Sequence, residues 1–154
     1  MDIKVRQIPI EQPEILEIRC HTLTDEIEEI ISFVKSGQGQ IGAKKNGREV
    51  EISVIDIFYA ESVDNRVFIY TANESFEVRQ RLYELEEKLS GRSFIRVQKS
   101  MLLNLMKIKA IKPALGGRYN ALLKNDEEII ISRKYVLDLK KALMKRSFGA
   151  GGKA

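Results

Sequence analysis

The chain has 154 residues, of which 44% are hydrophobic and 31% are charged, a composition typical of a soluble globular protein. No apolar stretch approaches the roughly 18 residues that a membrane-spanning helix needs, and the N-terminus lacks the basic and apolar regions of a secretion signal. We therefore expect a cytoplasmic protein that does not insert into a membrane. Because Cys20 is the single cysteine, the chain forms no disulfide within itself.

Charge is divided unevenly along the chain. Residues 92–154 contain 15 Lys and Arg against 4 Asp and Glu, a net charge of +11, whereas residues 1–91 contain 11 against 18, a net charge of −7. The C-terminal half can therefore supply an electrostatic footprint for phosphates. A basic half can equally be a solvated surface, so charge alone does not establish nucleic-acid binding.

The first 38 residues differ from the rest. Apolar and polar residues alternate over Ile3–Ile8 and Ile15–Cys20, which predicts two strands separated by a turn at Pro9–Pro13. Thr24 is a candidate N-cap for a short amphipathic helix. The apolar residues of that helix follow helical spacing: Ile27, Ile30, Ile31 and Val34. This β-α extension is expected to complete the domain core, or else to form an interface with a second protomer or with a regulatory membrane protein.

From Gln40 onward the pattern is one of short strands joined by turns. Asn46-Gly47 is the strongest short-range hairpin signal, and a second turn between strands is predicted at Asp64–Arg66. A helix is predicted from about Glu77 to Leu89, with leucines on one face and Gly91 ending it.

The C-terminal part continues this pattern. It predicts a strand over Phe94–Gln98, a short turn or single helical turn over Ser100–Leu105, and a strand over Lys107–Leu115. Two further strands follow, joined by a turn at Asn125–Asp126. A final helix is predicted to begin near Arg133. Its apolar residues are Val136, Leu139, Leu143 and Met144.

These elements predict a mainly β fold of many short strands braced by helices. We divide it into the extension over residues 1–38, a domain over residues 39–146 and a flexible tail over residues 147–154. No predicted helix combines a basic face with helix-turn-helix spacing, so recognition of a partner is expected from the loops between strands.

Three segments carry a family resemblance. They are IFYAESVDNRVFIYT (57–71), RSFIRVQKSMLLNLMKIKAI (92–111) and IIISRKYVLDLKKAL (129–143). Together they resemble the LytTR DNA-binding family, a module of bacterial transcription regulators. The resemblance covers residues 39–143 and implies a LytTR-like β-β-β arrangement in which three loops contact DNA bases.

The resemblance, carried over by motif position, implies a set of DNA-binding residues. The implied base contacts are Asn65, Arg66, Gln98, Lys99 and Arg133. Lys and Arg can donate to guanine and Asn can pair with adenine, so the residue types suit these roles. The expected phosphate contacts are Ser100, Lys107, Lys109 and Lys134.

Several of these residues have simpler interpretations. Asn65 can be a turn residue that tolerates a positive φ, Arg133 can pair with Asp138, and Lys99 can be merely solvated. Asn104 belongs to the same signature but lies in an apolar stretch. We therefore expect it to be a buried amide that bonds the backbone.

The sequence offers little support for an enzyme. His21 is the only histidine, and adjacent residues of a strand point to opposite faces, so Cys20 and His21 do not converge on a metal or on a substrate. We expect no catalytic residues, no metal site and no cofactor, and Cys20 is interpreted as a buried strand cysteine.

The resulting hypothesis is a bacterial transcription regulator that binds double-stranded DNA sequence-specifically. The resemblance implies tandem promoter repeats, one per protomer, and hence a homodimer at least on DNA. The main alternative is a non-enzymatic protein-interaction module whose basic half binds an acidic protein partner. RNA binding is disfavoured because the sequence lacks the interleaved aromatics on which single-stranded bases stack.

Overall fold

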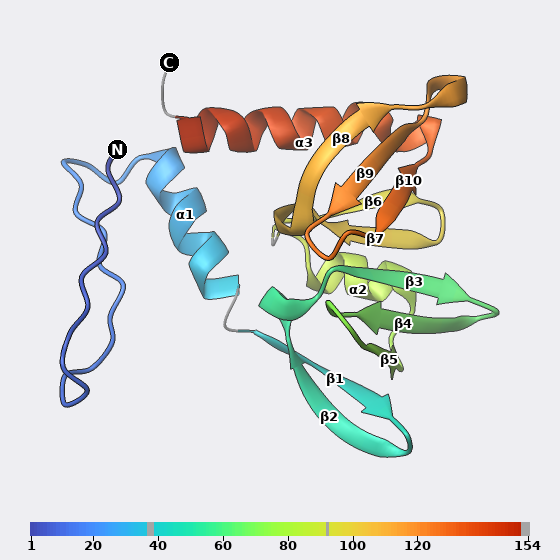
Figure 1. Cartoon of the computed structure of the whole chain (residues 1–154), viewed down its shortest axis with the longest axis horizontal. Helices are drawn as coiled ribbons and strands as arrows, with labels where there is room; N and C mark the ends of the chain where they lie inside the picture. The colour runs from blue at the N-terminus through green and yellow to red at the C-terminus, as the bar shows by residue number, and fades with distance from the viewer. Residues whose placement is uncertain (37–38, 92, 152–154) are drawn as a thin grey trace.

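The computed structural model describes residues 1–36, 39–91 and 93–151 (Figure 1). Ten strands form two antiparallel sheets, and three α-helices accompany them. The larger sheet has the order β2-β1-β5-β4-β3-β7-β6, and the smaller has the order β10-β9-β8. No helix in the described ranges has both the length and the hydropathy to cross a membrane.

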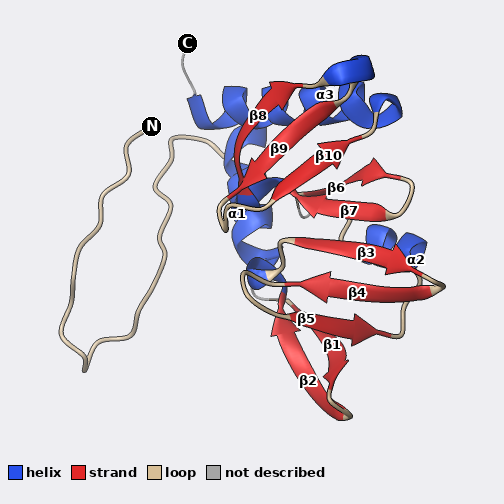
Figure 2. Ribbon diagram, turned by 45° about the vertical axis from the view of Figure 1, so that its right-hand side comes forward, coloured by secondary structure: helices blue, strands red, loops and turns tan. Residues whose placement is uncertain are grey.

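The larger sheet is built from β1 Gln40–Lys45, β2 Arg48–Ser53, β3 Tyr59–Val63, β4 Arg66–Tyr70, β5 Ser75–Val78, β6 Phe94–Gln98 and β7 Met101–Asn104. The smaller sheet contains β8 Ile108–Pro113, β9 Tyr119–Leu123 and β10 Glu128–Ile131. The helices are α1 Asp25–Ser36, α2 Leu82–Lys88 and α3 Arg133–Gly151 (Figure 2). This architecture confirms the mainly β prediction.

Two tight turns set the register of their hairpins. Asn46 and Gly47 have φ of 53° and 75°, and Asp64 and Asn65 have φ of 51° and 64°. Two successive positive φ values define the type I′ turn, whose twist matches that of the flanking strands. The hairpins predicted at these positions are therefore confirmed.

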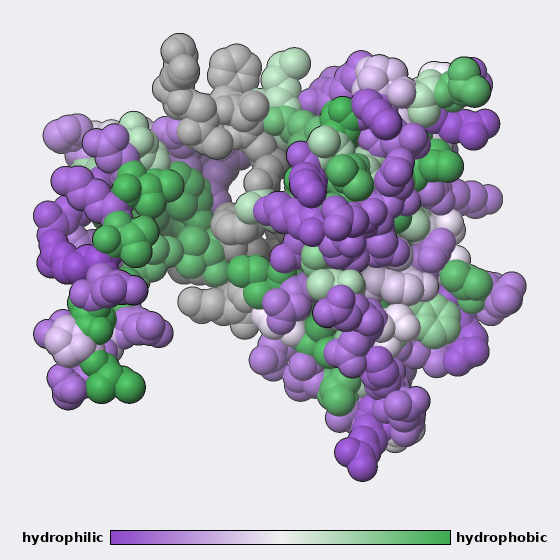
Figure 3. All heavy atoms as spheres, in the orientation of Figure 1, coloured by the Kyte–Doolittle hydropathy of each residue, from purple (hydrophilic) through white to green (hydrophobic). Residues whose placement is uncertain are grey.

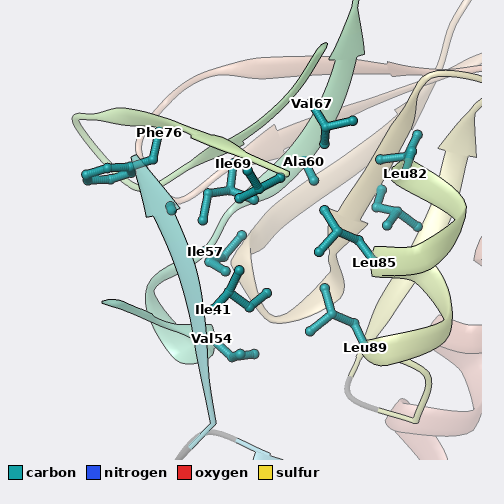
Figure 4. Packing of buried hydrophobic residues seen from close by; sticks show 13 residues of the cluster. Ile41, Val54, Ile57, Ala60, Val67, Ile69, Phe76, Leu82, Leu85 and Leu89 are labelled. Atoms are coloured by element: carbon teal, nitrogen blue, oxygen red, sulfur yellow. The ribbon is translucent and has the colours of Figure 1, made fainter. Parts of the chain in front are cut away.

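The larger sheet is buried on both faces at its centre. Leu102 of β7 faces one hydrophobic cluster, whereas its neighbours Met101 and Leu103 face the other, as the period of two in a strand requires. α2 covers the first face, with Leu85 and Leu89 fully buried against it (Figure 4). The smaller sheet and α3 cover the second face.

Asn104 is the buried polar residue of this core. Its side-chain nitrogen donates to the Ile57 carbonyl oxygen at 2.8 Å, and its side-chain oxygen accepts from the Met106 amide at 3.0 Å. Because both amide groups are bonded to backbone, burial at 4% exposure leaves them no unmet hydrogen bond. The prediction of a backbone-bonding amide is confirmed.

Three predictions within the domain need correction. The helix predicted from Glu77 begins at Leu82, because Ser75–Val78 pairs with β4 as strand β5. Ser100–Leu105 is mostly strand β7, whose four residues are all buried, and an uninterrupted apolar run does not reveal its period. Met144 is 61% exposed, so the apolar face of α3 ends at Leu143.

The tail predicted at residues 147–154 overlaps α3, which continues to Gly151. Residues 152–154 lie outside the described part of the chain. The helix begins at Arg133, as predicted, and packs through Val136, Leu139 and Leu143 on the second cluster. Its first turn is therefore anchored to the core of the domain.

The strands predicted at Ile3–Ile8 and Ile15–Cys20 do not form. Residues 1–23, which we call the arm, have no strand, and their one backbone hydrogen bond is the turn bond from the Gln12 amide to the Pro9 carbonyl oxygen at 3.0 Å. Cys20 is exposed, so its interpretation as a buried strand cysteine is wrong. Alternation predicts a strand only if a partner strand is present, and the described chain supplies none here.

Helix α1 follows the arm. The Ile27 amide donates to Thr24 Oγ1 at 3.3 Å, which confirms the predicted N-cap. Ile27 is buried, whereas Ile30, Ile31 and Val34 are half-buried. In the described residues, neither hydrophobic cluster includes a residue of the extension. The clusters do not test whether the extension completes the core, which stays a prediction. Apolar residues gather in the left half of Figure 3.

Candidate nucleic-acid interface

Three connections meet at one edge of the domain, which we call the loop edge. They are the β3–β4 turn, the β6–β7 turn and the junction of β10 with α3, and they lie on the right in Figure 1. The Ser62 amide donates to the Ser100 carbonyl oxygen at 2.8 Å, and the Ser132 amide donates to the Val97 carbonyl oxygen at 2.9 Å. These bonds connect the three segments through backbone, so their spacing is set by the sheets.

The β3–β4 turn carries Asn65 and Arg66, both exposed. Arg66 forms a two-point ion pair with Glu77 of β5, with distances of 3.0 Å from Nε to Oε2 and 2.7 Å from Nη2 to Oε1. The guanidinium holds the pKa of the Glu77 carboxyl below its usual range. Because Glu77 uses one side of the guanidinium, the outer N–H groups of Arg66 remain able to donate to a base or phosphate.

The β6–β7 turn carries Gln98, Lys99 and Ser100. Gln98 Nε2 donates to the Ile130 carbonyl oxygen at 2.6 Å and so joins β6 to β10. Lys99 is exposed and forms none of the ion pairs in the described ranges. The turn therefore presents the Lys99 ammonium to solvent, whereas one of the two side-chain N–H groups of Gln98 is used in a structural bond.

Arg96 supports this turn from below. Its side chain is 19% exposed, donates to the Lys99 carbonyl oxygen through Nη1, and lies 2.8 Å from Glu86 Oε1 through Nη2. Because two partners inside the fold accept hydrogen bonds from this guanidinium, few of its N–H groups remain to bind DNA. Arg96, whose residue type suggests phosphate contact, instead fixes the β6–β7 turn against α2.

Arg133 and Lys134 begin α3 at the loop edge and are exposed. The aliphatic part of Arg133 lies so close to Gly117 that a Cβ at position 117 would come within 2.8 Å of Arg133 Cδ. No ion pair to Asp138 is among those of the described residues. The Gly117 contact therefore restrains the stem of Arg133, while its charged end has no acidic partner in the described chain.

Lys107 and Lys109 lie at the opposite end of the smaller sheet. Pairing of Pro113 with Tyr119 and of Tyr119 with Ile131 defines the end next to α3, whereas Ile108 pairs with Leu123 at the far end. Lys107 Nζ lies 5.1 Å from the centre of the Phe58 ring. Lys109 Nζ lies 3.4 Å from Asp126 Oδ1. The structure does not bring these two lysines to the loop edge.

Two other basic residues do lie near it. Lys112 and Arg118 are exposed and flank the Gly116-Gly117 turn, which contacts Arg133. They were not predicted from the sequence because the DNA-contact positions carried over from the family resemblance are other residues. The signal that was available is the pair of cations around a double glycine, since a tight turn brings its two flanks together.

A groove beside Arg66 has a different character. It is lined by residues of β1, β2, β4 and β5, including Glu49 and Glu77, and by Arg79 and Arg81 of the connection between β5 and α2. Arg79 lies 3.8 Å from Glu49. Since acidic and basic groups are mixed there, the groove is a poor track for a phosphate backbone. At the loop edge, by contrast, Lys99 and Arg133 are exposed without an acidic partner in the described chain, although Arg66 pairs with Glu77.

Metal binding has no evident site in the part of the chain that is described. It contains no group of three or more His, Cys, Asp or Glu side chains that could hold an ion.

The chain belongs to the LytTR family, because the family model for the LytTr DNA-binding domain matches residues 47–144, more than half of its length. Together with the mainly β fold, this match confirms the resemblance seen in the three sequence segments.

Curated relatives include transcriptional regulators. The sensory transduction protein LytT of Bacillus subtilis is 34% identical over 108 residues, which are 70% of this chain and 45% of LytT. The transcriptional regulatory protein YpdB of Escherichia coli is 32% identical over 104 residues, 67% of this chain and 43% of YpdB. The chain thus spans less than half the length of these two relatives. An uncharacterized HTH-type transcriptional regulator of Staphylococcus aureus is 27% identical over 130 residues, 83% of this chain and 88% of that protein.

A solved structure shares the fold. The LytTr DNA-binding domain of a methyl-accepting/DNA response regulator from Bacillus cereus superposes with a TM-score of 0.65 at 24% identity, covering 70% of this chain and 98% of that domain. At this identity the likeness concerns the fold alone.

Proposed function

We propose that the chain binds double-stranded DNA sequence-specifically through its loop edge and acts as a bacterial transcription regulator. The observation that carries this proposal is the meeting of three separate connections at one edge, each with an exposed cation: Arg66, Lys99 and Arg133. Cations fixed on a rigid scaffold can both neutralise phosphates and address base edges.

The roles within the loop edge follow from the surroundings of each side chain. Arg66, Lys99 and Arg133 are the proposed base readers, with Asn65 beside Arg66 at the tip of its turn. Gln98 contributes through its amide oxygen or its second side-chain N–H, since the first N–H bonds the Ile130 carbonyl oxygen. Ser100 and Lys134 are the proposed phosphate contacts within the edge. Lys107 and Lys109 would reach only phosphates beyond it.

The further features of this proposal come from the family. Two protomers would occupy tandem imperfect repeats in a promoter, forming a homodimer at least on DNA. The protein would act in the cytoplasm without catalytic activity or a cofactor, and a regulatory membrane protein is a candidate partner. The name of YpdB, a transcriptional regulatory protein, supports the assignment to transcription.

Selection of bound fragments from a pool of random duplex DNA tests the proposal. We expect enrichment of a defined sequence and an affinity that falls steeply with salt, with a slope of about −0.9 in log K against log salt for each neutralised phosphate. An affinity absent for all duplexes, or insensitive to salt, would overturn DNA binding. That result would favour the alternative of an acidic protein partner for the basic half.

A further inference from the structure

The arm carries many exposed apolar side chains among the described residues. Its exposed apolar side chains are Met1 at 76%, Ile3 at 89%, Val5 at 90%, Ile8 at 37%, Ile10 at 95%, Ile15 at 77%, Leu16 at 71% and Leu23 at 60%. Contiguous exposed apolar surface marks a site of association in soluble proteins. Because Val5 stays 90% exposed, its side chain contributes almost no hydrophobic stabilisation to the folded single chain.

The backbone of the arm is also without partners in the described chain. Residues 2–8 form a first limb and residues 14–20 a second, joined by the turn at Pro9–Gln12. Figure 2 shows the limbs spread apart as an open loop, and no backbone hydrogen bond joins them. Extended segments with free N–H and C=O groups are templates for adding a strand.

Charge on the two limbs indicates which partner fits. The first limb carries Asp2, Lys4 and Arg6, a net charge of +1, and the second carries Glu14, Glu17 and Arg19, a net charge of −1. Glu17 pairs with Arg19 in its own limb. No ion pair among the described residues joins one limb to the other.

We propose that the arm associates with the arm of a second copy of this chain, the first limb of each lying against the second limb of the other. A two-fold axis makes this exchange reciprocal, so both pairs of oppositely charged limbs are matched at once. Uniformly charged partners such as nucleic acid or an anionic membrane would be repelled by one limb. Pro9 and Pro13, which lack an N–H, confine the pairing to the limbs.

The position of the arm suits this role. Figure 1 places the arm on the side of the molecule away from the β3–β4 and β6–β7 turns. Two copies joined through their arms therefore keep both loop edges free. The association needs no DNA, so it can be tested independently of the proposed function.

Two charge-reversal variants of the full chain test the pairing. Their self-association is measured by light scattering in the absence of DNA. One variant carries Lys4→Glu and Arg6→Glu, and the other carries Glu14→Lys and Glu17→Lys. Each variant alone juxtaposes like charges, and we expect its dissociation constant for self-association to rise about tenfold or more. An equimolar mixture of the two variants restores opposite charges at both limb pairs and should associate like the wild type.

The single cysteine supplies an independent measurement. Cys20 is exposed at the end of the second limb, so one nitroxide label per chain reports on two arms in contact. We expect dipolar coupling between labels in the wild type and in the mixture, and its loss in each variant alone. A wild-type chain that stays monomeric at all concentrations, variants that associate unchanged, or a mixture that fails to recover would overturn the proposal. Unchanged far-UV circular dichroism confirms that the variants are folded.

Discussion

The loop edge and the arm are both exposed, yet they are organised in opposite ways. The loop edge presents polar side chains from connections whose backbone is bonded to neighbouring strands, such as Ser62 to Ser100 and Ser132 to Val97. The arm presents apolar side chains from a backbone with a single turn bond. Recognition of a defined ligand needs side chains held by a scaffold, whereas an unpaired arm can acquire order from a partner.

The comparison also separates two ways in which sequence patterns work. The buried residues of β7 run without interruption because both faces of this strand are covered, with Leu102 on one face and Leu103 on the other. The arm instead alternates apolar and polar residues, although no other strand lies beside it. We therefore expect the stability of the fold to depend on the core behind the loop edge and not on the arm, and four measurements test this difference.

The largest effect is expected from truncating the core behind the loop edge. Leu102→Ala should lower the free energy of unfolding by about 2–5 kcal/mol, because a fully buried leucine leaves a cavity. Val5→Ala, at 90% exposure in the arm, should change it by less than about 0.5 kcal/mol. Urea denaturation of both variants, at a concentration where the wild type is monomeric, makes the comparison. Equal losses would show that the arm belongs to the folded core.

A smaller effect is expected in DNA binding. Arg133→Ala should weaken binding to the preferred duplex by about 1–3 kcal/mol and relax the preference at one base position. The reason is that Arg133 begins α3 at the loop edge without an acidic partner among the described residues. Titration of preferred and random duplexes measures both quantities. If the affinity falls by the same factor for the preferred and the random duplex, Arg133 contacts phosphate rather than a base.

Lys109→Ala should have a weaker and less selective effect. Lys109 lies at the far end of the smaller sheet, near Asp126, so at most one phosphate contact depends on it. We expect the affinity for specific and random duplexes to fall by similar factors. The slope of log K against log salt should flatten by about 0.9 or less. Titrations at two salt concentrations suffice. A loss confined to the preferred sequence would place the DNA over this end of the domain as well.

The smallest effect concerns pH. Arg66 lowers the pKa of Glu77 in the folded chain, so the pair contributes stability that is present above the pKa of Glu77 in the unfolded chain and is lost as pH falls through the lower folded pKa. Glu77→Gln should therefore reduce the difference in unfolding free energy between neutral and acidic pH. Because both groups are exposed to water, the change should be small. An unchanged pH dependence would show that the ion pair adds nothing to the fold.

Local signals in the sequence determined the elements of the domain. Asn46-Gly47 and Asp64-Asn65 specify tight hairpins because these residues adopt positive φ at low cost, and Thr24 marks a helix start because its side chain accepts a hydrogen bond from the Ile27 amide. The signature segments similarly identified the LytTR family and its mainly β fold. The loop-edge residues were named from that resemblance, and their contacts with DNA stay predictions.

Features that depend on a partner distant in the sequence follow only from the tertiary structure. Ser75–Val78 is a strand because β4 lies beside it, although its residues also fit a helical start. Arg96 is a structural cation because Glu86 and the Lys99 carbonyl oxygen are within reach, and Lys107 and Lys109 lie away from the loop edge because of the register of β8. In the arm, apolar and polar residues alternate as they do in a strand. No sheet forms there, because no neighbouring strand is present to accept and donate the backbone hydrogen bonds.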